Sequence, residues 1–168
     1  MNLDGSGGVQ ITPDEEDVLQ FSWSPDGREI LYAAQTHDPV SENVSFGIRI
    51  VNADGSSLRR LTSENVDSTP VWSPDGGRIA FYSQSRPPSS VWVMDVGGSD
   101  LQPLVPGNLT FRMHRWSPDG QKVAVSDGND IFVVLLDDPA VAVPDFGPLS
   151  AVAAFSVVVF AIRVRRRL

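Results

Sequence analysis

The sequence predicts an all-β fold made of β-propeller blades, and three observations support this prediction. The pentapeptide Trp-Ser-Pro-Asp-Gly occurs three times, beginning at Trp23, Trp72 and Trp116. The spacings of 49 and 44 residues lie near the length of one four-stranded blade, about 40–50 residues. Segments rich in β-branched and aromatic residues follow each copy. We therefore expect about three four-stranded antiparallel blades that form part of a larger propeller.

Each blade is expected to begin with an apolar strand that ends at the tryptophan. The Ser-Pro-Asp-Gly sequence then reverses the chain, because proline presets φ, aspartate accepts hydrogen bonds from the backbone and glycine tolerates a positive φ. Three of the four tryptophans occupy this one position in the repeat. We interpret them as core residues and not as platforms for a ligand.

The second and third strands follow from short β-type segments after each turn. The second strands are predicted at 30–32, 79–82 and 123–125, and the third strands at 48–51, 91–94 and 131–134. A turn containing glycine then leads to a short fourth strand, which the last unit lacks. The chain itself starts with a fourth-strand segment at 8–12. Either the chain is a fragment of a longer propeller, or two copies form a homodimer that completes a six-bladed ring.

The flanks of the repeats resemble a known family. Residues 1–12 align without a gap onto 51–62, and residues 95–105 align onto 52–62. On these residues the segment 1–138 resembles the WD-like repeats of TolB-type proteins and of the prolyl oligopeptidase propeller. The resemblance implies a non-catalytic binding or scaffold module with a protein or glycan partner. The alternative is the propeller remnant of a prolyl-oligopeptidase-like serine peptidase that lacks its hydrolase domain.

Composition and motifs argue against several other functions. The chain has no cysteine, which excludes disulfides and thiol catalysis. Residues 1–162 contain 21 acids and nine bases, and such a negative body repels nucleic acid. His37 and His114 have no metal-binding spacing, and no nucleophile elbow or phosphate loop is present. Residues 127–130 indicate a tight hairpin instead of a calcium loop. We therefore expect no enzyme activity, cofactor or metal site.

The blade topology places the variable segments on one face. Successive strands alternate in direction, so the loops between second and third strands and the connections between blades share one end, which we call the loop face. The Ser-Pro-Asp-Gly and Asp-Gly turns share the opposite end, the turn face. The loop face collects many acids, with Arg86 as its clear base. We predict that it binds a cationic partner or divalent ions, the alternative being a solvated acidic rim. The candidate residues are Asp14, Glu15, Glu16, Asp17, Asp38, Glu42, Glu64 and Asp67.

The C-terminal segment leaves the repeat pattern. Residues 139–148 form a linker that contains Pro144, Asp145, Phe146 and Gly147, and residues 149–168 contain an uncharged apolar stretch followed by arginines. This pattern predicts a transmembrane helix with a cytoplasmic basic end; the alternative is a buried C-terminal strand or helix. The order resembles the sorting signals of archaeal surface proteins. That resemblance implies recognition of Pro144 to Gly147 by an archaeosortase-like transpeptidase, a lipid anchor and a location on the cell surface.

Overall fold

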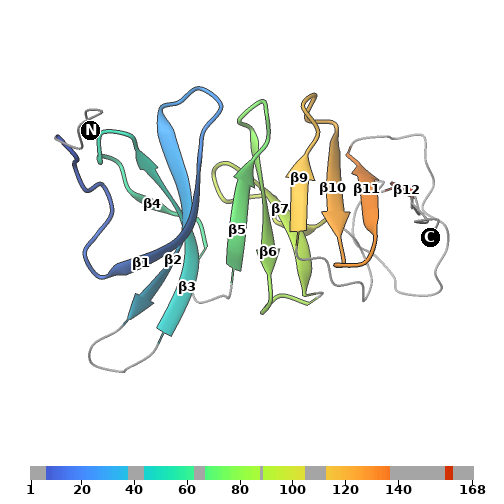
Figure 1. Cartoon of the computed structure of the whole chain (residues 1–168), viewed down its shortest axis with the longest axis horizontal. Coiled ribbons are helices and arrows are strands. Elements are labelled where there is room, and N and C mark those ends of the chain that lie inside the picture. Colours follow the sequence, from blue (N-terminus) through green and yellow to red (C-terminus); the bar gives the residue numbers. More distant parts are fainter. Residues whose placement is uncertain are drawn as a thin grey trace, which may run out of the picture.

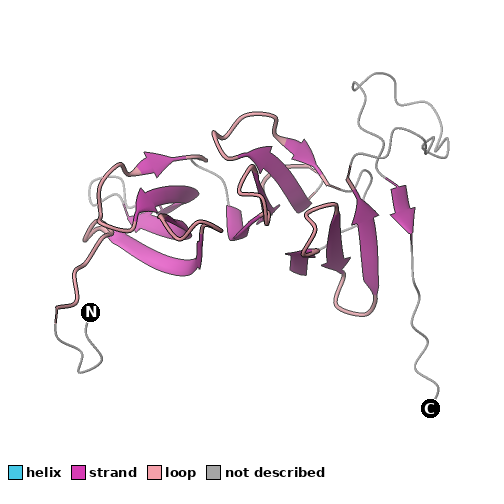
Figure 2. Ribbon diagram, turned by 90° about the horizontal axis from the view of Figure 1, so that it is seen from above, coloured by secondary structure: helices cyan, strands magenta, loops and turns pink. Residues whose placement is uncertain are grey.

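The computed structural model describes residues 7–37, 44–62, 67–87, 89–104, 113–136 and 158–160. These residues form three four-stranded antiparallel sheets that lie side by side in chain order (Figure 1, Figure 2). Blade 1 contains β1 (Glu16–Trp23), β2 (Glu29–His37), β3 (Val44–Asn52) and β4 (Arg59–Arg60). Blade 2 contains β5 (Asp67–Trp72), β6 (Arg78–Ser83), β7 (Ser90–Asp95) and β8 (Gln102–Pro103). Blade 3 contains β9 (Met113–Trp116), β10 (Lys122–Ser126), β11 (Ile131–Leu135) and β12 (Val158–Phe160).

Three antiparallel blades and their strand order confirm the predicted all-β fold. In each blade the first strand ends at the tryptophan of the repeat, and the predicted second and third strands lie within the observed ones. The registers repeat as well, since Trp23 lies opposite Ile30, Trp72 opposite Ile79, and Trp116 opposite Val123. Equivalent positions in the three sequences therefore occupy equivalent places in the three sheets.

The fourth strand of blade 3 differs from the prediction. β12 pairs antiparallel with β11, and Val159 lies opposite Val134. Its three residues belong to the segment 149–168, for which the sequence predicts a transmembrane helix, and here they form a strand. A valine-rich, uncharged sequence suits the edge of an incomplete sheet. The other residues of 139–168, including the predicted sorting motif, lie outside the described part. No helix among the described residues is long and apolar enough to cross a membrane.

The Ser-Pro-Asp-Gly turns have the same hydrogen bonds in all three blades. In the first, the Ser24 hydroxyl donates to Asp26 Oδ1 at 2.7 Å, and the Gly27 amide donates to the Ser24 carbonyl at 3.0 Å. The same Asp26 oxygen accepts the Arg28 amide at 3.1 Å. The glycine that ends each turn has a φ of 70–74°, a conformation that glycine adopts without a Cβ penalty. The predicted turn chemistry is confirmed.

The core lies between the blades. We call the side of a blade that faces the preceding blade its front face, and the side that faces the following blade its rear face. The interface between blades 1 and 2 buries Leu31, Ile48 and Ile50 from one rear face and Trp72, Ile79 and Phe81 from the next front face. The interface between blades 2 and 3 buries Ala80, Val91, Val93, Val123, Val125 and Val134. Burial of these apolar side chains holds the blades together.

The two ends of the blades follow the predicted division into faces. In Figure 1 the hairpin turns after β1, β5 and β9 lie at the top, and the turn between β10 and β11 lies at the bottom. The top is the turn face and the bottom is the loop face. The first strand of every blade therefore begins at the loop face.

Candidate functional site

Three of the predicted acidic residues are exposed on the loop face. Asp14 and Glu15 lie in the segment that leads into β1, and Asp17 is the second residue of that strand. The Gln10 side-chain amide donates to Asp14 Oδ1 at 2.7 Å. Asp17 Oδ2 lies 3.3 Å from Nε2 of His37, at the end of β2. The candidates that lie outside the described residues are Asp38, Glu42 and Glu64.

The Glu16 side chain is buried, although the sequence predicts that it is exposed on the loop face. Its Oε1 lies 2.6 Å from Nε of Arg49, and both side chains are almost fully buried. The Tyr32 hydroxyl donates to the second carboxylate oxygen at 2.9 Å, and Arg49 Nη2 donates to the Thr36 hydroxyl at 2.6 Å. Burial lowers the pKa of Arg49. Burial, with the Glu16 carboxylate, raises the pKa of Tyr32. The sequence feature that could have indicated this buried pair is the single arginine, Arg49, inside the otherwise apolar segment 48–51.

Asp67 is also buried, which corrects its predicted exposure. Its Oδ2 lies 3.6 Å from Nη2 of Arg86, the arginine that is predicted to lie on the same face. Glu16 and Asp67 each occupy the first position of a first strand. In both blades the buried carboxylate at this position forms an ion pair with an arginine of the same blade. Among the described candidates, the acids that face solvent are Asp14, Glu15 and Asp17.

A groove of about 920 Å³ runs along the first strands of the three blades. Its lining comes from β1, β5, β9, β10 and β11, through residues 19–22, 69–71, 113–115, 124–126 and Ile131. Leu19, Met113 and Ile131 are exposed apolar side chains in this lining, and Gln20 and Arg115 add polar groups. Apolar walls with a few polar groups are typical of binding sites. The groove could not be predicted from the sequence, because its lining residues come from different blades and each one resembles an ordinary strand residue.

The groove follows the first strands and reaches the loop face, where these strands begin. It extends from Leu19, Thr69 and Met113 to Ser22, Val71 and Arg115. Ser126 and Ile131 flank the turn between β10 and β11, also on the loop face. The exposed acids of β1 and the groove therefore share one end of the molecule.

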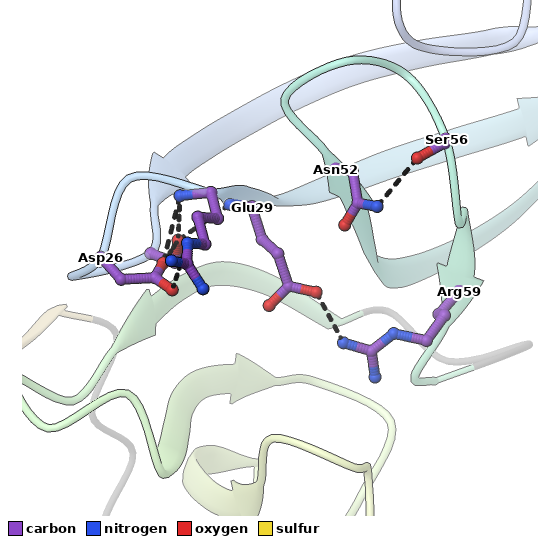
Figure 3. Close-up of polar contacts among 7 residues, drawn as sticks. Asp26, Glu29, Asn52, Ser56 and Arg59 are labelled. Carbon is purple, nitrogen blue, oxygen red and sulfur yellow. Dashed lines mark hydrogen bonds and ion pairs between the residues drawn. The ribbon is translucent and has the colours of Figure 1, made fainter.

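Polar side chains of the turn face bond to one another, as Figure 3 shows for blade 1. Arg59 Nη2 donates to Glu29 Oε1 at 3.0 Å, and the Asn52 side-chain amide donates to the Ser56 hydroxyl at 2.8 Å. The Ser24 hydroxyl and the Arg28 amide hold the pKa of the Asp26 carboxyl below its usual value. These contacts stabilise the turns themselves.

Comparison with known proteins identifies a family. Residues 21–142 match the PD40 family, described as a TolB beta propeller domain. The chain belongs to this family. The predicted resemblance of residues 1–138 to TolB-type repeats is thereby confirmed for residues 21–138.

Individual relatives of this PD40 chain include both TolB proteins and peptidases. The Tol-Pal system protein TolB of Anaeromyxobacter dehalogenans is 36% identical over 105 residues, which are 61% of this chain and 22% of that protein. Dipeptidyl-peptidase 5 of Porphyromonas gingivalis is 36% identical over 67 residues, which are 39% of this chain and 10% of that protein. The solved structure of a TolB-type protein from Agrobacterium tumefaciens has a TM-score of 0.57 and 25% identity, covering 76% of this chain and 47% of the other. The PD40 chain thus spans less than half the length of each of these proteins.

His114 is buried between blades 2 and 3 of the PD40 domain. Its Nε2 lies 3.2 Å from the carbonyl oxygen of Ala80, and the residue is 1% exposed. Burial lowers the pKa of His114 from 6.5 to about 4. His114 is therefore part of the buried packing between these two blades.

We expect the stability of the PD40 domain to rise with pH between about pH 4 and 6.5. In this range the unfolded chain binds a proton at His114 that the folded chain excludes, so acidification favours unfolding. The effect amounts to roughly 3 kcal/mol across the range. Urea unfolding at several pH values measures it. His114→Gln keeps a donor for the Ala80 carbonyl and should remove this pH dependence, whereas His37→Gln should retain it. An unchanged slope in His114→Gln would contradict the assignment.

The segment 127–130 forms the predicted tight hairpin. Asp127 Oδ1 accepts the amides of Asn129 at 2.9 Å and Asp130 at 2.8 Å. Gly128 between them has a φ of 100°. Within the described ranges, no group of three or more histidine, cysteine, aspartate or glutamate residues is placed to hold a metal ion.

Proposed function

We propose that this PD40 chain is a non-catalytic binding or scaffold module whose loop face binds a protein with basic residues around an apolar segment. The observation that supports this proposal is the groove of about 920 Å³ beside exposed acids. Asp17 and Leu19 stand two positions apart on β1, so negative charge and exposed apolar surface adjoin each other. A partner with the complementary pattern gains both apolar burial and charge attraction.

The exposed charges at this site favour a partner that binds weakly and whose affinity falls as the salt concentration rises. Asp14, Glu15 and Asp17 are exposed, so each charge contributes little alone and is screened by salt. The apolar lining, which includes Leu19 and Met113, supplies the part of the affinity that salt does not weaken. The acids then mainly set the rate of association and the preference for cationic partners.

A direct test uses a labelled peptide with two lysines on each side of three leucines, and a matched peptide with glutamates in place of the lysines. Fluorescence anisotropy measures the affinity of each peptide at low and high salt. The variant Asp14→Asn, Glu15→Gln, Asp17→Asn should bind the cationic peptide about tenfold more weakly at low salt, because three exposed charge contacts are lost. The difference should shrink at high salt.

The control variant neutralises three acids on the turn face, Glu29→Gln, Asp54→Asn and Asp100→Asn. It changes the net charge by the same amount and leaves the loop face intact. The control should bind the cationic peptide as the original chain does. An equal loss of affinity in both variants, or equal binding of the two peptides, would contradict a specific site on the loop face.

A second candidate function is supported by the match to dipeptidyl-peptidase 5 of Porphyromonas gingivalis at 36% identity over 67 residues. In this alternative the blades are the propeller part of a peptidase of the prolyl oligopeptidase type, and the loop face contacts a catalytic domain. The loop face would then have no preference for a separate cationic segment. Equal binding of the cationic peptide by the original chain and the loop-face variant favours this alternative.

We infer that the module is displayed on the cell surface, anchored through residues 149–168. The support is the order of the linker with Pro144, Asp145, Phe146 and Gly147, the apolar stretch and the terminal arginines. Residues 158–160 cannot lie in a bilayer while they form β12 beside β11. Insertion into a membrane and completion of blade 3 are therefore alternative states of this segment.

A further inference from the structure

The interfaces between blades bury the same positions each time. On rear faces, Ile48 of blade 1 and the equivalent Val91 of blade 2 are both 0% exposed. On the front face of blade 2, the repeat tryptophan Trp72 is 7% exposed. In blade 3 the equivalent Trp116 packs against the apolar cluster between blades 2 and 3, and its Nε1 donates to the Val71 carbonyl at 3.2 Å. A front face thus packs on the preceding rear face through a fixed set of positions.

At the two ends of the row of blades, the equivalent of Trp72 and the equivalent of Ile48 and Val91 are exposed, whereas Tyr32, Ala34 and Val51 on the front face of blade 1 are buried. Trp23, on the front face of blade 1, is 55% exposed, and its neighbour Phe21 is 69% exposed. Ile131, which occupies in blade 3 the position of Ile48 and Val91, is 62% exposed. Exposed aromatic and apolar side chains grouped on a sheet face indicate an interaction surface.

We propose that a second copy of this chain covers both surfaces. The front face of blade 1 in each copy packs on the rear face of blade 3 in the other copy, by the contact that already joins consecutive blades. Two such contacts are related by a two-fold axis and close a ring of six blades, a number within the usual range for propellers.

The N-terminal segment already occupies the place of a strand from a preceding blade. A Cβ built on Gly55 of blade 1 would lie 3.5 Å from Ile11. A Cβ built on the equivalent Gly98 of blade 2 would lie 3.4 Å from the carbonyl oxygen of Leu61, just after the fourth strand of blade 1. Ile11 therefore lies on blade 1 as Leu61 lies on blade 2. In the paired molecule this segment adjoins β11 of the other copy, at the edge that β12 occupies in the single chain.

Sedimentation equilibrium of the full chain tests the pairing over a range of concentrations. The expected species has twice the chain mass of 18.2 kDa. Trp23→Asp and Ile131→Asp should each weaken the dimer by at least about thirtyfold, because a charge is placed in a packed interface. Leu58→Asp changes an exposed apolar residue outside both surfaces and should leave the dimer unchanged. Circular dichroism shows whether each variant retains its fold.

Mixing the two defective variants distinguishes this interface from a symmetric one. A pair of one Trp23→Asp copy and one Ile131→Asp copy has one intact contact and one contact that is damaged on both sides. The mixture should therefore dimerise more strongly than either variant alone. A chain that stays monomeric at all concentrations, a dimer that is insensitive to both substitutions, or a series of larger open oligomers would each overturn the proposal.

Discussion

Glu16→Ala is expected to lower the free energy of unfolding by about 3–5 kcal/mol, because it leaves a buried guanidinium without its counter-charge. Arg49 is 2% exposed and its Nε lies 2.6 Å from the Glu16 carboxylate. Its remaining donors contact the Thr36 hydroxyl and the carbonyls of Ala34 and Gly47. These neutral acceptors cannot compensate the charge. Guanidinium chloride unfolding of the full chain measures the loss through the midpoint at constant slope.

The matched control is Asp17→Ala, one residue further along β1. The Asp17 side chain is 71% exposed and contacts His37 at 3.3 Å, so its removal should change the free energy of unfolding by no more than about 0.5 kcal/mol. Replacing both partners of the buried pair, as in Glu16→Leu with Arg49→Met, removes both charges and should recover much of the loss. Equal effects of Glu16→Ala and Asp17→Ala would show that the buried pair adds no stability.

The features that sequence alone predicts are those that depend on local chemistry. The Ser-Pro-Asp-Gly turns need only four residues to specify their hydrogen bonds, and Gly27, Gly76 and Gly120 have the positive φ that the turn requires. Strand order follows, because tight turns impose antiparallel neighbours. The division into a turn face and a loop face is then a geometric consequence. The PD40 match over residues 21–142 agrees with the repeat family that these turns indicate.

The features that sequence alone did not predict depend on contacts between distant residues. Glu16 and Asp17 are adjacent acids with the same local propensities, yet one is buried and the other exposed. The difference lies in Arg49, which reaches Glu16 from β3. The groove likewise exists only where the strands of three blades converge. Composition and motifs report charge and turn chemistry, but not which side chain a neighbouring strand covers.

The C-terminal segment shows how one sequence can fit two environments. Valine-rich, uncharged residues suit both a lipid bilayer and the edge of an incomplete sheet. Hydropathy alone favours a membrane helix over 149–168, whereas pairing with β11 gives residues 158–160 a strand partner. The open edge of β11 makes this pairing available, and it follows from the arrangement of the third blade and not from hydropathy.

Trp72→Ala is expected to lower the free energy of unfolding by about 3–5 kcal/mol, the cost of removing a large aromatic side chain from a packed core. Trp72 packs between blades 1 and 2 with residues such as Leu31, Ile48 and Phe81. Its loss leaves a cavity in the interface that fixes the first two blades relative to each other. Chemical unfolding in dilute solution, where single chains predominate, measures the effect.

The other repeat tryptophans provide internal controls, because sequence context is the same and only the neighbouring blade differs. Trp116→Ala should cost less than Trp72→Ala, since Trp116 is partly exposed, although Arg78 lies 5.5 Å from its ring centre. Trp23→Ala should cost about 1 kcal/mol or less in dilute solution, because Trp23 is 55% exposed. Equal losses at all three positions would mean that the tryptophan stabilises its own blade. A graded series means that each tryptophan gains its stabilising effect from the blade that packs against it.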